Sequence, residues 1–369
     1  MDIIGIICEY NPFHNGHIYH LNKIKEMYPN SLIILILNGY FLERGEISIL
    51  TKEDKVKIAL QNNIDLVIEL PFVFGCQSAD TFADISIKML NELNTQKLIF
   101  GSECNDINFL TKVAQKQLED DFNQSVKNNL KKGMNYPTAL NKSLNINLNS
   151  PNDLLAISYI KSIIKNNFNI EPISIQRTNN YHDTSSNDSI ISASNIRNKL
   201  KHNLDISNYT PYSHLIKNVN KELLFNILKY KIISEPNLSK YLTVDEGIEY
   251  KLLKEINNVE SIDELILKIK SKRYTYNRLQ RMLIHILIGL TKEDIQNLKL
   301  EYIKVLGFNY KGQEYLKSIN SNLLIQRKIS DEYLAQKYEL ISSSIYDLLT
   351  NEKTLEFELS NKPIIKRTI

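Results

Sequence analysis

Short apolar runs and longer amphipathic stretches alternate along the first 200 residues of the chain. The apolar runs are nearly continuous and rich in β-branched residues, which is typical of parallel strands buried on both faces. They cover residues 3–8, 32–37, 66–70 and 97–100, and the helical patterns between them cover residues 17–28, 52–61 and 79–93. This alternation, at intervals of about 30 residues, predicts an α/β fold with a doubly wound, mostly parallel sheet.

The pattern changes further along the chain. Residues 106–170 predict helices broken by a turn at 133–137, and a short strand at 173–176 and a helix at 192–200 follow. Around residues 208–212 a polar stretch containing Pro211 precedes a mostly helical remainder. We therefore expect a Rossmann-like α/β domain at residues 1–205 and a mainly α-helical C-terminal domain at residues 206–369.

A small net charge hides an uneven distribution. The 369 residues include 45 Lys and Arg against 42 Asp and Glu, a formal charge of +3. Residues 1–200 carry −2 and residues 201–369 carry +5, and residues 265–292 hold seven basic residues and no acidic one. We call residues 265–292 the basic segment, because such a run is a candidate footprint for a polyanion.

Cysteine usage and hydropathy indicate a cytoplasmic protein. The three cysteines, Cys8, Cys76 and Cys104, form no CxxC pair and have no metal-ligand spacing, so we expect reduced thiols in the core and no protein-built metal site. The chain starts with an apolar run and lacks a charged n-region with a cleavage site, so no signal peptide is predicted. Its apolar runs are far shorter than the ~20 residues that span a bilayer.

The strongest chemical signal follows the first predicted strand. The string Glu9-Tyr-Asn-Pro-Phe-His-Asn-Gly-His17 opens the first predicted helix, and His20 lies within it. A helix N-terminus offers free N–H groups and a positive dipole end to phosphate. Imidazoles beside it can donate hydrogen bonds to charge that develops on an α-phosphate during adenylyl transfer, and Gly16 leaves room for a nucleotide. The alternative is a histidine-rich surface turn.

This arrangement resembles the HxGH motif of the nucleotidyltransferase superfamily, which includes class I aminoacyl-tRNA synthetases and small adenylyltransferases. The longer string resembles the tRNA(Met) cytidine acetate ligase family. The resemblance implies an ATP-dependent ligase that forms acetyl-adenylate with release of pyrophosphate. It then acetylates N4 of the wobble cytidine in the anticodon loop of elongator tRNA(Met), releasing AMP. His14 and His17 would be catalytic, and Mg²⁺ is expected, as in most phosphoryl chemistry. No membrane or protein partner is implied.

Further blocks resemble the same family, and together they cover residues 1 to about 315. The segment Ile191-Ser-Ala-Ser-Asn-Ile-Arg197 is similar to the second phosphate motif of the superfamily. By resemblance, ATP is contacted by Ile7, Cys8, Glu9, Tyr10, Asn11, Pro12, Phe13, His14, Asn15, Gly16, His17, His20, Gly101, Asn152, Arg177, Ser194 and Arg197. Taken alone, Gly101 could be a turn glycine, Asn152 a helix cap, and Arg197 a surface charge.

Three smaller features accompany these blocks. Arg44 and Glu46 follow the second predicted strand and are candidates for the substrate side by position alone. Tyr40 stands where the family is expected to have a small or basic residue, and Cys8 where it is expected to have an apolar one. A Tyr181-His-Asp183 cluster follows Arg177, but adjacent residues rarely converge on one ligand.

The basic segment combines Lys and Arg with tyrosines. Its candidate tRNA-binding residues are Lys268, Lys270, Lys272, Arg273, Tyr274, Tyr276, Arg278 and Arg281. Arg278, Arg281 and His285 are spaced to share one face of a helix, opposite an apolar face. Guanidinium groups and tyrosine rings suit phosphates and unstacked bases of RNA. With the family resemblance, this predicts a tRNA-binding role for the C-terminal domain; a solvated helix would show a similar pattern.

Two other functions are compatible with parts of this evidence. A small-molecule adenylyltransferase that makes a coenzyme precursor would carry the same HxGH motif, although it would not need a long basic C-terminal half. A non-catalytic RNA-binding protein could retain the nucleotide-binding fold. Against decay of the site, His14, Gly16, His17 and Arg197 are all intact.

Overall fold

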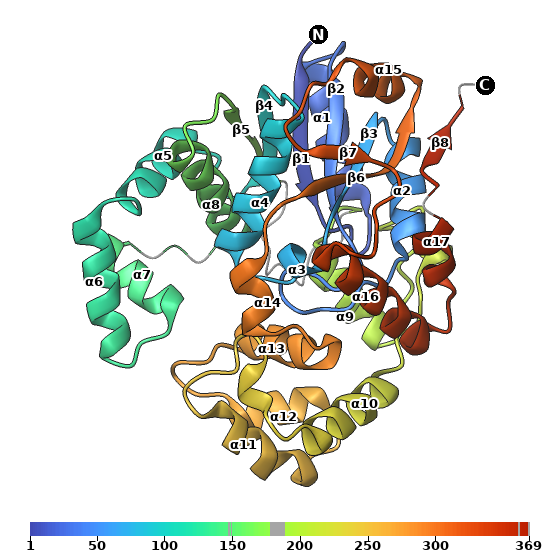
Figure 1. Cartoon of the computed structure of the whole chain (residues 1–369). Coiled ribbons are helices and arrows are strands. Elements are labelled where there is room, and N and C mark those ends of the chain that lie inside the picture. Colours follow the sequence, from blue (N-terminus) through green and yellow to red (C-terminus); the bar gives the residue numbers. More distant parts are fainter. Residues whose placement is uncertain (147, 149, 178–188, 361, 368–369) are drawn as a thin grey trace.

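A single mixed sheet forms the centre of the computed structural model, which describes residues 1–146, 148, 150–177, 189–360 and 362–367 (Figure 1). Its strands are β1 (Ile3–Cys8), β2 (Leu32–Asn38), β3 (Leu66–Leu70), β4 (Lys97–Ser102), β5 (Glu171–Gln176), β6 (Tyr302–Asn309), β7 (Leu324–Gln326) and β8 (Ile364–Lys366). They are ordered β5-β4-β1-β2-β3-β6-β7, and β8 pairs with β6. Strands β1 to β5 pair in parallel, which confirms the predicted α/β sheet.

Helices cover both faces of this sheet. In the first half of the chain they are α1 (Asn15–Met27), α2 (Lys52–Gln61), α3 (Phe72–Gly75), α4 (Ala79–Glu92), α5 (Ile107–Lys116), α6 (Asp120–Lys131), α7 (Tyr136–Leu144), α8 (Pro151–Lys165) and α9 (Ala193–Lys201). Alternate side chains of β2 enter two separate hydrophobic clusters. Ile34 packs on the face covered by α4 and α8, and Ile33 packs on the face covered by α1 and α2. The sheet is therefore doubly wound, as predicted.

Local signals explain where these helices begin. Helix α2 begins as predicted, because the Thr51 side chain accepts a hydrogen bond from the Asp54 N–H and caps the helix. Helix α1 starts two residues earlier than the predicted residue 17, because His14 caps it. The predicted break between residues 133 and 137 separates α6 from α7.

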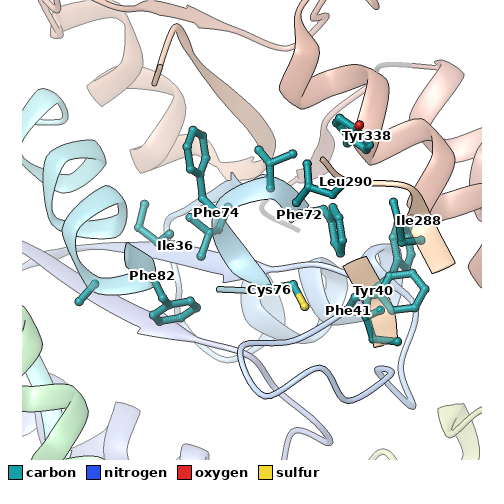
Figure 2. Close-up of a cluster of buried hydrophobic side chains, with 14 of the residues drawn as sticks. Ile36, Tyr40, Phe41, Phe72, Phe74, Cys76, Phe82, Ile288, Leu290 and Tyr338 are labelled. Carbon is teal, nitrogen blue, oxygen red and sulfur yellow. The ribbon is translucent and has the colours of Figure 1, made fainter. Parts of the chain in front are cut away.

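The second half begins with a helical layer, which lies at the bottom of Figure 1. It contains α10 (Lys221–Ser234), α11 (Ile248–Glu255), α12 (Ile262–Ile269), α13 (Tyr276–Ile288) and α14 (Lys292–Asn297). Figure 2 shows that the core continues from the sheet into this layer, since Ile36 and Phe72 lie in the same cluster as Ile288 and Leu290. None of the helices in the described part of the chain combines the length and apolarity of a membrane span.

The end of the chain returns to the sheet, which the sequence did not predict. Strand β6 pairs antiparallel with β3, and it carries β7 and β8 in parallel. The helices α15 (Tyr310–Ser318), α16 (Leu334–Thr350) and α17 (Thr354–Ser360) accompany these strands. A division at residue 205 would therefore place β6, β7 and β8 with the helical layer, although the residues from 302 onward belong structurally to the sheet.

A buried group of charges ties this end of the chain to the N-terminal half. The Lys52 Nζ lies 2.6 Å from Glu69 and 2.5 Å from both Glu339 and Glu358, and Lys304 lies 2.7 Å from Glu358. Burial alone would lower the pKa of Lys52, but the three carboxylates raise it well above its usual range. We call these five residues the buried charge cluster. Each charge has a partner there, which buried ions require.

Candidate active site at the carboxyl ends of the parallel strands

The chief candidate site is a cavity of about 260 Å³ beyond the carboxyl ends of β1, β4 and β5. Strand β1 connects to β2 on one side, while β4 lies on its other side, so the strand order reverses between β1 and β4. Such a switch point opens a crevice where ligands bind in doubly wound sheets. The helix N-termini of α1 and α9 meet at its wall, with His14 and Ser192 both lining it.

The two histidines of the HxGH motif form a reciprocal helix cap. The Gly16 N–H donates to His14 Nδ1 at 3.0 Å, and the His14 N–H donates to His17 Nδ1 at 3.1 Å. Their spacing of three residues is the spacing of a capping box, with imidazoles in place of the usual hydroxyl and carboxylate. A neutral imidazole that accepts at Nδ1 carries its proton on Nε2. Both rings can therefore donate through Nε2.

Gly16 has a packing role in this cap. A Cβ at this position would lie 2.6 Å from His14 Cε1 and 2.9 Å from His14 Nδ1. Any other residue would push the His14 ring out of its capping position. The glycine in the motif is thus explained by the imidazole beside it, before any nucleotide is considered.

The histidines on the cavity wall are held in their neutral form. Burial, together with the charges of Arg177 and Arg197, lowers the pKa of His14 to about 3. Burial and the neighbouring imidazoles lower the pKa of His17 well below its usual value, and burial with Arg177 lowers that of His20 to about 4. Neutral rings fit the role of hydrogen-bond donors, because they keep one N–H without bringing an additional charge into the site.

Helix α9 presents the second phosphate motif to the same cavity. Ser192 caps the helix by accepting from the Asn195 N–H, and its hydroxyl lies 2.9 Å from that of Ser194. The Arg197 guanidinium donates to the Asn11 carbonyl at 2.6 Å and contacts both carboxylate oxygens of Glu46 at 2.7 and 2.8 Å. The motif at α9 is therefore joined directly to the motif before α1.

Glu103 contacts two of the predicted ATP-binding residues, Asn152 and Arg177. Asn152 Nδ2 donates to Glu103 Oε1 at 2.5 Å, and Arg177 Nε lies 3.7 Å from the same oxygen. A Cβ on Gly101 would lie 3.4 Å from Arg177 Cγ, so the arginine side chain covers the end of β4. The ends of β4 and β5 and the start of α8 thus bring Gly101, Asn152 and Arg177 together on the cavity wall.

All but three of the predicted ATP-binding residues line the cavity, as do Arg44 and Glu46. The exceptions are Pro12, Phe13 and Asn15. Phe13 is fully buried and stacks on the His17 ring at a centroid distance of 5.3 Å. The Asn15 amide donates to the carbonyls of Ser189 and Asn208. These residues support the wall from behind, and the cluster Tyr181-His-Asp183 lies outside the described residues.

Sequence reasoning missed several wall residues, of which Glu43 is the most informative. Its N–H donates to Glu9 Oε1 at 2.7 Å, and Arg281 Nη1 lies 3.3 Å from its carboxylate. Burial raises the pKa of the Glu43 carboxyl to about 7, although Arg281 opposes the shift. The other missed residues are Phe82, Ile99, Phe100, Leu155, Tyr159, Ile175, Gln176, Ile190, Ile191 and Ala193. Most of them lie near a strand end or a helix start, whereas Tyr159 lies in the middle of α8.

The basic segment divides between surface and interior. Lys268, Lys270, Lys272 and Arg273 are exposed, as a tRNA-binding role requires. The Tyr274 ring is only 4% exposed, and its hydroxyl donates to the Asp245 carbonyl, so the expectation that it faces RNA is corrected.

The rest of the segment is engaged within the protein. The Tyr276 hydroxyl donates to Asp263, and Arg278 stacks on Tyr274 and pairs with Asp245. The expected stripe of Arg278, Arg281 and His285 is also corrected, because His285 is fully buried and its Nε2 donates to the Cys76 carbonyl. Arg281 points toward Glu43 of the cavity wall.

The cysteines do not share one environment. Cys76 is buried as expected, and Cys8 is partly buried at the cavity wall. Cys104 is exposed, which corrects the expectation of a third core thiol, because the chain leaves the sheet after Ser102.

Fold and site together define a nucleotidyltransferase with an HxGH motif. The sequence profile described as HIGH Nucleotidyl Transferase matches residues 1–361. The structure superposes on the crystal structure of Thermotoga maritima TmcAL (apo, form I) with a TM-score of 0.89 and 26% identity, covering all of both chains. A second structure, Thermotoga maritima TmcAL bound with alpha-thio ATP, gives a TM-score of 0.87 at 25% identity over all of both chains.

Curated relatives narrow this class. The tRNA(Met) cytidine acetate ligase of Caldicellulosiruptor bescii is 36% identical, covering 99% of this chain and 98% of the relative. That of Mycoplasma mobile is 38% identical, covering 78% of this chain and 99% of the relative. The chain belongs to the tRNA(Met) cytidine acetate ligase family, which confirms the resemblance recognised in the sequence.

Proposed function

We propose that the protein is an ATP-dependent ligase that acetylates N4 of the wobble cytidine of elongator tRNA(Met). The observation that carries this proposal is the reciprocal His14–His17 cap, which places two Nε2–H donors at the wall of a cavity shared with the α9 N-terminus. The family supplies the identity of the substrates, since its relatives are named for tRNA(Met) cytidine acetate ligation.

In the first step, a carboxylate oxygen of acetate attacks the α-phosphorus of ATP. A bond forms between this oxygen and phosphorus, the bond to the β-phosphate oxygen breaks, and pyrophosphate leaves. Negative charge accumulates on the α-phosphate oxygens in the transition state. The Nε2–H groups of His14 and His17 would donate hydrogen bonds to these oxygens. Because both rings are neutral and fixed by backbone N–H donors, they need no reorganisation as charge develops.

Pyrophosphate would be held at the start of α9. The Ser194 hydroxyl and the helix N–H groups supply neutral donors, and the Arg197 guanidinium supplies a planar fork. In the structure this fork contacts Glu46, so binding of phosphate would redistribute the hydrogen bonds of Arg197 between Glu46 and the ligand. Glu46 and Arg44 then belong to the part of the wall that meets both substrates.

In the second step, the N4 amine of cytidine attacks the acetyl carbon of acetyl-adenylate. A carbon–nitrogen bond forms, the carbon–oxygen bond to the phosphate breaks, AMP leaves, and the amine loses one proton. The target base lies in an anticodon loop, where extrusion costs less than in a duplex. The exposed part of the basic segment, with Lys268, Lys270, Lys272 and Arg273, would bind the tRNA backbone. The protein would act in the cytoplasm.

Mg²⁺ would accompany the phosphates of ATP. The carboxylates on the cavity wall are engaged: Glu46 with Arg197, Glu43 with Arg281, and Glu9 with Asn38 and the Glu43 N–H. These residues do not form a ready ligand set for a hard cation, which prefers several free oxygen ligands. Phosphate oxygens and water would therefore supply most of its ligands.

The test is incubation of the purified protein with ATP, acetate and total tRNA. We expect AMP and N4-acetylcytidine to form together, and pyrophosphate exchange into ATP to require acetate. AMP release that depends on neither acetate nor tRNA would contradict the proposal. A small-molecule adenylyltransferase would transfer AMP to a soluble acceptor, and a non-catalytic RNA-binding protein would bind tRNA without consuming ATP.

A further inference from the structure

Arg281 lies in the basic segment of the sequence, but its side chain contacts Glu43 on the wall of the candidate active-site cavity, which we call the nucleotide cavity. Its side chain is 15% exposed, and that of its partner Glu43 is 13% exposed. We propose that Arg281 is a positioning residue for adenylate formation: it clamps the loop at residues 42–46 against the cavity and is not a ligand of RNA. This inference rests on the proposed function, because it concerns the first step of that reaction.

The clamp has two parts. Arg281 Nη1 donates to the Glu43 carbonyl and to its carboxylate, both at 3.3 Å. The second part is Gly45, which lies against the backbone of α13. A Cβ on Gly45 would be 2.7 Å from the backbone nitrogen of Arg281 and 2.8 Å from the carbonyl carbon of Gln280. Gly45 also has a φ of +76°, a conformation that favours glycine. The loop is thus seated directly on the helix.

The other side of the loop faces the reaction site. The Glu43 N–H donates to Glu9 at the end of β1, and Glu46 holds Arg197 of α9 through both carboxylate oxygens. A tight turn keeps these two contacts at a fixed separation, since the Gly45 N–H donates to the Leu42 carbonyl and the Leu42 N–H to the Glu46 carbonyl. A shift of α13 would therefore move Arg197, which is the proposed pyrophosphate ligand.

The neighbouring arginines on this side of the molecule make different contacts. Arg278, three residues earlier on α13, pairs with Asp245, and Arg273 pairs with Glu246. Both partners lie in the loop before α11, outside the cavity. Helix α13 therefore has an arginine that contacts the cavity wall and another that lies nearer the solvent, and the two should differ in which step they affect.

The experiment compares Arg281→Met and Arg281→Lys in two assays on the full-length protein. The first is acetate-dependent pyrophosphate exchange without tRNA, and the second is tRNA binding over a range of salt concentrations. We expect Arg281→Met to lower kcat for exchange by about tenfold or more, with the tRNA Kd and its salt slope unchanged. Arg281→Lys retains one donor and should recover part of the lost kcat. Arg327→Met, at an exposed arginine outside both regions, is the matched control.

A second variant reaches the same contact from the other side. Gly45→Ala leaves Arg281 intact but places a methyl group against the α13 backbone, so we expect a loss of exchange activity in the same direction. Normal exchange in Arg281→Met, or weaker tRNA binding with a shallower salt slope, would overturn the inference. A loss of activity that only follows a lower unfolding temperature, without recovery in Arg281→Lys, would also overturn it. If the wild-type protein shows no acetate-dependent exchange, the proposed function itself fails.

Discussion

The nucleotide cavity and the basic segment place their polar side chains by different means. In the cavity, His14, His17 and Ser192 are held by hydrogen bonds to backbone groups at helix starts. In the basic segment, side chains extend from helical and loop positions toward whatever lies beside them, so Lys272 reaches solvent while Arg281 reaches Glu43. A helix cap fixes the position of a side-chain atom, whereas helical periodicity fixes only the direction in which a side chain leaves the helix.

This difference leads to different expectations for substitution. Removing a donor from the cavity should slow a chemical step strongly, because the remaining groups cannot move to replace it. Removing one exposed cation from the basic segment should weaken binding by a small amount, because the neighbouring cations act independently through a screened field. The following changes test the comparison, in order of expected effect.

The largest effect is expected from His17→Ala. Loss of one preorganised donor in a buried site lowers kcat by roughly 10²–10³-fold, and loss of the Nδ1 acceptor also removes half of the cap. The measurement is acetate-dependent pyrophosphate exchange at saturating ATP. His214→Ala, at an exposed histidine outside the cavity, serves as the control. Activity close to wild type in His17→Ala would mean that the cavity is not the site of adenylation.

The second prediction is that acid pH destabilises the folded protein through a buried histidine in each of the two regions. His20 at the cavity and His285 of α13 each have a pKa lowered to about 4 by burial, against an ordinary value of 6.5. Below pH 6.5 the unfolded chain binds protons that the folded protein does not, so the free energy of unfolding falls as the pH decreases toward 4. Each group contributes up to about 1.4 kcal/mol per pH unit.

The check is chemical denaturation at pH 7, 6 and 5. His285→Gln and His20→Gln should each flatten the dependence of the unfolding free energy on pH below 6.5. If neither buried variant flattens it, the acid sensitivity arises from other groups and the two regions do not share this property.

A smaller effect is expected from Arg273→Ala. Its side chain is 54% exposed and pairs with the exposed Glu246, so it is available to a phosphate. Loss of one phosphate contact should weaken tRNA binding a few-fold and reduce the slope of log K against log salt by about 0.7–0.9. Filter binding at several salt concentrations measures both quantities. An unchanged slope would place the tRNA surface elsewhere.

The smallest effect is expected from Tyr274→Phe. The ring is buried under Arg278, so it cannot stack on a base, and tRNA affinity should stay at the wild-type value. The lost hydrogen bond to the Asp245 carbonyl should lower the unfolding free energy by about 1 kcal/mol. A large loss of tRNA affinity would show that the segment rearranges on binding, and the contrast between the two regions would then be weaker.

The features that were predictable from the sequence are those fixed by nearby residues. The cap at His14 and His17 involves four consecutive positions, and strand ends place Gly101 and Arg177 by the rules of parallel sheets. The role of Glu43 was not predictable, because its partner Arg281 lies 238 residues away. Strand β6 was missed for a related reason. Lys304 interrupts its apolar run, and pairing with the distant Glu69 and Glu358 makes a lysine acceptable there.

The return of the chain to the sheet has a consequence for how the protein is made. Domains generally fold as they leave the ribosome, N-terminal part first. Here the first half emerges with nearly every residue of the catalytic cavity, yet β3 has a bare edge until β6 arrives, and Lys52 lacks Glu339 and Glu358 until the last part of the chain is synthesised. We therefore expect the catalytic half to complete its folding only when almost the whole chain has been synthesised. We also expect a premature stop near residue 350, which removes Glu358 and β8, to destabilise the sheet although every residue that lines the cavity is still present.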